Sequence, residues 1–143
     1  MKTENDLNAY LSKSFKRHGS SLFAFKVADK YTSGMSDFLV WHAGKSYALE
    51  VKFIKTFPKT AGGKILGHEF SPRQLTRMRQ MSSAGVRCLG AVGVHGEGLY
   101  LVPLTRLPDS GNWSLSEWKA AGFRRVCFKE TDRLMVEMEA ACE

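Results

Sequence analysis

The stretch DFLVWHAGKSYALEVKF, residues 37–53, contains two apolar runs separated by His42-Ala-Gly-Lys45. A short connection with glycine between two such runs is typical of a β-hairpin. A symmetric turn centred on Ala43-Gly44 pairs residues whose numbers sum to 87, so it places Asp37 directly opposite Glu50. The hairpin therefore predicts two carboxylates side by side on one face of a sheet, with Cβ atoms about 4.5–5.5 Å apart.

Lys52 belongs to the same face as Glu50, because side chains one residue apart along a strand point the same way. Two carboxylates this close repel each other, so either one takes up a proton or a cation lies between them. Mg²⁺ or Mn²⁺ would suit, since hard cations prefer oxygen ligands, and the Lys52 ammonium could then hold a water or face a phosphate. The alternative is an amphipathic strand with a solvated polar face, on which Lys52 neutralises Glu50. A β-bulge would also remove the pairing.

The rest of the chain predicts helices around this hairpin. The apolar spacing of Leu7, Tyr10 and Leu11 indicates a helix, and a second helix opens with an N-cap serine and a proline. The expected elements are a helix at 3–17, strands at 21–28, 37–41 and 46–54, a loop at 55–70, a helix at 71–84, strands at 87–94 and 98–103, and helices at 114–121 and 131–141. The order α-β-β-β-α-β-β-α predicts an α/β (α+β) fold, a mixed central sheet of about five strands flanked by helices. We expect residues 1–143 to form a single domain.

Positive charge is concentrated in one part of the chain. The 143 residues carry 21 Lys and Arg against 14 Asp and Glu, a net charge of +7. Nine of the basic residues and only two acids lie between Lys45 and Arg87, so this segment accounts for the whole excess. A basic surface of this kind favours a polyanionic partner through counterion release.

Cysteine usage and hydropathy exclude several other classes. The three cysteines are scattered and none forms a CxxC pair, which favours reduced, mostly buried thiols over disulfides or zinc. No apolar run approaches the roughly 18–20 residues that span a bilayer, and the polar start lacks the apolar core of a signal peptide. We therefore expect a cytoplasmic protein with no membrane partner.

The residues TSGMSDF, followed after twelve positions by EVK, resemble the signature of the PD-(D/E)XK nuclease superfamily. Asp37 matches the aspartate of the motif and Glu50-Val51-Lys52 matches its (D/E)-X-K part. Within the superfamily the chain is similar to RecU-type Holliday junction resolvases and to the VRR-NUC domains common in phages. Ser36 stands where the motif has its proline, a position that is commonly replaced in the superfamily.

Other features contribute to the resemblance, which covers roughly residues 3–105. They are an approach to the aspartate through Thr32-Ser-Gly, an acid in the first helix at Glu4, a helix start from Ser71 to Gln74 about twenty residues after the lysine, and Gly85 before an apolar strand. Residues 106–143 match no pattern and are assigned to a C-terminal extension.

The resemblance implies a restriction-endonuclease-like fold and a site for Mg²⁺ or Mn²⁺. Asp37, Glu50 and the backbone carbonyl of Val51 would bind the metal, and Lys52 would position or activate the attacking water. Glu4 would complete the metal shell, although an acid in a first helical turn is also favoured by the helix dipole. Gln74 would approach the site from its helix, or cap that helix together with Ser71, or do both.

Further residues are candidates for DNA contacts. Thr32 and Ser33 would contact a phosphate, unless they are ordinary turn residues. Arg73 and Arg77 share one helix face because they are four residues apart. With three lysines they form a basic set whose alternative role is that of a solvated charged face. This set consists of Lys55, Lys59, Lys64, Arg73 and Arg77.

The leading hypothesis is a metal-dependent endodeoxyribonuclease that cuts branched DNA as a Holliday junction resolvase in a bacterial cell, with a phage or host origin left open. Paired cuts in a four-way junction imply a homodimer. One alternative keeps the chemistry and changes the substrate, as in a flap, nicking or restriction-type nuclease. Another is a DNA-binding module without catalysis, against which the complete set of acids and lysine argues.

Overall fold

The fold is built on one six-stranded sheet whose strands follow the order β1-β2-β3-β4-β5-β6. The computed structural model describes residues 3–27, 37–65, 70–106, 113–130 and 132–143. The strands are β1 (Leu22–Lys26), β2 (Phe38–His42), β3 (Lys45–Ile54), β4 (Arg87–Val94), β5 (Gly98–Pro103) and β6 (Arg124–Val126). Strands β3 and β4 run parallel and the other neighbours antiparallel, which confirms the mixed sheet expected from the sequence.

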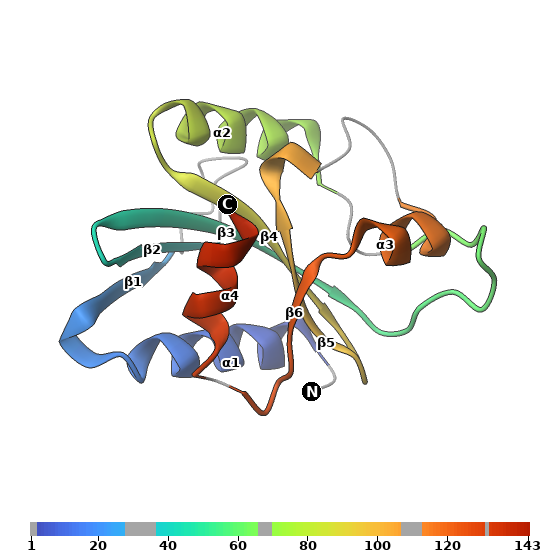
Figure 1. Ribbon diagram of the computed structural model, residues 1–143, viewed down its shortest axis with the longest axis horizontal. Coiled ribbons are helices and arrows are strands. Elements are labelled where there is room, and N and C mark those ends of the chain that lie inside the picture. Colours follow the sequence, from blue (N-terminus) through green and yellow to red (C-terminus); the bar gives the residue numbers. More distant parts are fainter. Residues whose placement is uncertain (1–2, 28–36, 66–69, 107–112, 131) are drawn as a thin grey trace.

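Helices cover both faces of the sheet (Figure 1). They are α1 (Glu4–Lys16), α2 (Pro72–Ser83), α3 (Leu115–Ala121) and α4 (Leu134–Ala141), with short 3₁₀ turns η1 (Gly19–Ser21) and η2 (Leu104–Arg106). Capping boxes begin α1, α2 and α3, each with a serine or threonine that accepts a backbone hydrogen bond. No helix in the described part of the chain is long and apolar enough to cross a membrane.

Two hydrophobic clusters pack on opposite faces of the sheet. One gathers α1 and α4 against the sheet, with Leu7, Leu49 and Val51 among its buried residues. The other gathers α2 and α3 on the opposite face, with Leu75 and Trp118 buried there. Alternation along β3 therefore directs Glu50 and Lys52 toward the face that carries α2.

The hairpin has the predicted register. Its turn consists of Ala43 and Gly44, whose φ angles of 52° and 75° are the positive values that a type I′ turn requires. The pairs run from His42 with Lys45 to Phe38 with Leu49, and each pair sums to 87 as expected. This register brings the start of β2 next to the middle of β3.

The expectation of about five strands is wrong by one. β6 pairs with β5 and adds a sixth strand between α3 and α4, so the element order continues beyond the predicted α-β-β-β-α-β-β-α. It has only three residues, of which two are exposed, so it offers no alternating pattern to detect. The segment 106–143 also supplies Leu134 and Met138 to the core cluster of α1.

Candidate functional site

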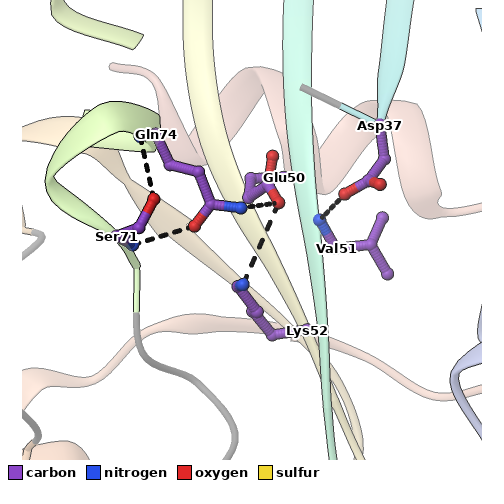
Figure 2. A network of polar contacts seen from close by, with 6 residues as sticks. All are labelled: Asp37, Glu50, Val51, Lys52, Ser71 and Gln74. Carbon is purple, nitrogen blue, oxygen red and sulfur yellow. Dashed lines mark hydrogen bonds and ion pairs between the residues drawn. The ribbon is translucent and has the colours of Figure 1, made fainter. Parts of the chain in front are cut away.

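Asp37 precedes β2 and is fixed to β3 by two hydrogen bonds. Its backbone N–H donates to the Leu49 carbonyl at 2.9 Å, and its Oδ2 accepts from the Val51 N–H at 2.7 Å. The pairing of β2 with β3 ends at Phe38 and Leu49, so the expected pair of Asp37 with Glu50 does not form part of the sheet. Asp37 is held instead by its hydrogen bonds to Leu49 and Val51, the neighbours of Glu50. Figure 2 shows the Asp37 carboxylate beside Glu50 and Val51 of β3.

Glu50 is a buried acid, with only 4% of its surface exposed. Its Oε1 accepts a hydrogen bond of 2.6 Å from Gln74 Nε2, whereas its Oε2 is buried without a hydrogen-bond partner in the described part of the chain. Burial, followed by the negative charge of Asp37, raises the pKa of Glu50 to about 8, although Lys52 acts in the opposite direction. At neutral pH and without a cation, Glu50 therefore keeps its proton.

Lys52 lies at the rim of the site. Its Nζ is 4.0 Å from Glu50 Oε1, and its side chain is 21% exposed. The same Nζ lies over the Phe70 ring, 5.6 Å from the ring centroid, within the range of a cation–π contact. The Lys52 side chain thus lies between the buried acid and solvent.

Phe70 and Gly90 belong to the site although the sequence interpretation did not name them. Gly90 of β4 pairs with Glu50, and a Cβ atom at Gly90 would lie 2.7 Å from Cζ of Phe70. The missing side chain makes room for the ring, which packs beside the acid and faces Lys52. A glycine inside an apolar strand is a known sign of close approach and is the signal that could have indicated this contact.

Gln74 makes both of the contacts considered from the sequence. Its Oε1 accepts from the Ser71 N–H at 2.9 Å, and its backbone N–H donates to Ser71 Oγ at 3.1 Å. Its Nε2 reaches Glu50 in the same conformation. The start of α2 is therefore tied directly to the buried acid (Figure 2).

The other candidates lie around this centre. Glu4 stands exposed in the first turn of α1 and raises the pKa of Glu50 less than Asp37 does. Lys64 forms an isolated β-bridge with Ser114, at the start of α3. The side chains of the predicted basic set are all exposed, namely those of Lys55, Lys59, Lys64, Arg73 and Arg77. Thr32 and Ser33 lie outside the described residues.

The oxygen atoms of the site fit a hard divalent cation. The buried Oε2 of Glu50 has no hydrogen bond in the described structure, and the Asp37 carboxylate is held next to it. No group of three or more His, Cys, Asp or Glu side chains gathers within the described ranges. Two carboxylates and the Val51 carbonyl are a sufficient protein contribution for Mg²⁺, which keeps several waters and often binds a substrate phosphate.

Comparisons with known proteins give evidence at the level of the fold. No family model and no curated protein matches the sequence. The structure is similar to that of Hjc, a Holliday junction resolvase from the archaeal hyperthermophile Archaeoglobus fulgidus. The TM-score is 0.55 at 16% identity, and the match covers 86% of this chain and 88% of that one. A VRR_NUC domain matches with a TM-score of 0.45 at 22% identity, over 66% of this chain and 87% of that domain. The chain thus has a fold similar to that of this resolvase, in agreement with the mixed sheet and flanking helices expected from the sequence.

Proposed function

We propose that this protein is a divalent-metal-dependent endodeoxyribonuclease that hydrolyses phosphodiester bonds in branched DNA, with four-way junctions as the preferred substrate. The observation that carries the proposal is the buried Glu50, whose Oε2 lacks a partner in the described structure and whose neighbours are Asp37 and Lys52. A buried acid with a strongly raised pKa, next to a second acid and a lysine, is typical of a catalytic or metal-binding site.

Each residue has a distinct task in this proposal. Asp37 is held in place by the Val51 N–H, and Gln74 fixes Oε1 of Glu50 so that Oε2 stays available. Mg²⁺ or Mn²⁺, when bound by Asp37, Glu50 and the Val51 carbonyl, would polarise the scissile phosphate and lower the pKa of a bound water. Lys52, at the rim, would hold the attacking water or face the negative charge that develops on the phosphate.

Charge and fold support DNA as the substrate. The net charge of +7 favours a polyanion, and the basic residues after β3 and on α2 are exposed to receive phosphates. The structure with TM-score 0.55 is that of a Holliday junction resolvase. Symmetric cleavage of a junction needs two sites related by a twofold axis, so we include a homodimer in the proposal.

The test is cleavage of labelled four-way junction, flap and linear duplex DNA at equal concentration, with Mg²⁺ or with EDTA. We expect paired nicks in the junction when Mg²⁺ is present and none in EDTA. The nicks should be lost in Asp37→Asn and Glu50→Gln. The control is Glu97→Gln. This residue lies on the β4–β5 turn, and its exposed carboxylate pairs with Arg125 of β6. Equal cleavage by wild type and Asp37→Asn would refute the catalytic proposal, and preferred cutting of the flap or duplex would refute the junction as substrate.

A further inference from the structure

Three aromatic side chains are exposed together on β1 and β2. Phe23 is 63% exposed, Phe25 is 52% exposed and Trp41 is 44% exposed. Phe23 pairs with Trp41 across the two strands, and their ring centroids are 5.6 Å apart. Phe25 pairs with Leu39 in the same register. We call Phe23, Phe25 and Trp41 the aromatic platform.

The aromatic platform shares its sheet face with the candidate site. Leu39 packs with the cluster of α2 and α3, whereas Phe38 and Val40 pack with the cluster of α1 and α4. Alternation therefore assigns Asp37, Leu39 and Trp41 to one face. Leu39 lies two residues from Asp37 along the chain, a rise of about 7 Å, and Phe25 faces Leu39 from the neighbouring strand, about 5 Å to the side.

The sheet face that carries the platform also carries positive charge at the candidate site. Arg77 follows Gln74 by three residues, so it lies on the same flank of α2 as the amide that reaches Glu50. Arg77 is exposed, and Lys52 of β3, at the candidate site, is partly exposed. An aromatic surface on the same sheet face as basic side chains matches the two parts of a nucleotide, a flat base and a phosphate.

The size of the platform suits bases better than a second copy of the chain. Because an aromatic side chain offers roughly 150–250 Å², the exposed parts of the three amount to about 300 Å². Each partner in a stable complex buries about 800 Å². Stacked bases need only one ring face each, and unpaired strands are commonly bound on exposed aromatics of a sheet.

We propose that the aromatic platform stacks unpaired bases of the strand whose phosphate lies at Asp37, Glu50 and Lys52. This inference rests on the proposed function and narrows its substrate class to DNA with unstacked nucleotides beside the cleaved bond. Fully paired duplex hides the faces of its bases and cannot use the platform, whereas a branch point or an unpaired segment exposes them.

The test uses the fluorescence of Trp41 in EDTA, with a single-stranded oligonucleotide, a four-way junction and a duplex of the same sequence. Trp113 and Trp118 are buried, so Trp41 is the tryptophan within reach of a base in the described structure. We expect quenching by the single strand and the junction but little by the duplex. Phe25→Ala and Trp41→Ala should weaken single-strand binding at least about fivefold, measured by the anisotropy of a dye-labelled oligonucleotide because Trp41→Ala removes the fluorescent reporter. The matched control is Val136→Ala, which trims a residue of α4 that is also 63% exposed.

The outcomes separate this inference from the proposed nuclease. Quenching without cleavage of any DNA would support the platform and refute the nuclease. Cleavage of junctions with unchanged single-strand binding in both aromatic variants would refute the platform alone. If Phe25→Ala instead converts a dimer to a monomer in analytical ultracentrifugation and leaves the quenching intact, the patch is an interface between copies and the inference is wrong. Circular dichroism of each variant checks that it folds.

Discussion

Replacing Glu50 with glutamine should remove a pH dependence from the stability of the fold. Burial and the Asp37 charge raise the pKa of Glu50 from 4.5 to about 8. The unfolded chain releases this proton near the ordinary value, whereas the folded chain keeps it until about pH 8. Since the folded state binds more protons in this window, its stability falls as the pH rises through it.

The size of the effect follows from the two pKa values. The slope is about 1.4 kcal/mol for each pH unit between them, so the full loss is on the order of 5 kcal/mol at complete coupling. Below pH 4.5 the acid is protonated in both states and costs nothing, and above about pH 8 the loss is complete. Glutamine stays neutral and can still accept the Gln74 hydrogen bond, so Glu50→Gln lacks this slope.

The assay is urea unfolding in EDTA at several values between pH 4.5 and 8.5, for wild type and Glu50→Gln. The difference between the two curves isolates this acid from other groups that titrate in the range. We expect the variant to become the more stable protein as the pH rises. Mn²⁺ should restore stability to wild type by mass action but not to the variant. Parallel curves in EDTA would refute the reasoning, because they would show that Glu50 is charged in the folded state at little cost.

The remaining predictions concern residues around Glu50. Gly90→Ala forces Phe70 away from a Cβ that would stand 2.7 Å from its ring, so we expect a loss of about 1–3 kcal/mol in urea unfolding. Gly62→Ala, with nothing within 4 Å, is the control, and equal stability of the two variants would contradict the prediction. Gln74→Ala should lower the cleavage rate more than Ser71→Ala, which removes only a helix cap worth about 1 kcal/mol. Equal cleavage rates would mean that the Glu50 contact has no catalytic value.

The hairpin was predictable because two independent signals agree on it. Gly44 suits a tight turn, and the alternation on both sides permits only one register that keeps Leu49 and Val51 in the core. This register alone places Asp37, just before β2, close to Glu50, inside β3. The position of Asp37 beside Glu50 is thus a local property of a short stretch of sequence.

The rest of the site depends on contacts between distant parts of the chain. Phe70 follows a segment without periodicity, and its position depends on the absence of a side chain at Gly90, twenty residues later. The raised pKa of Glu50 also follows from burial by these distant groups, which no spacing rule reports. β6 was missed for a simpler reason, since three residues are too few to show a period.

The hydrogen bonds of Gln74 restrict which amino acid can occupy its position. One end of its side chain accepts from the Ser71 N–H while the other donates to Glu50. Glutamate could cap the helix but could not donate to Glu50 and would add a third carboxylate to the site, and lysine could donate but not accept. Asparagine has the same amide on a shorter stem. Because one amide serves both contacts, fraying of the first turn of α2 would also release the buried acid, so hydrogen exchange at that turn should slow when a cation occupies the site.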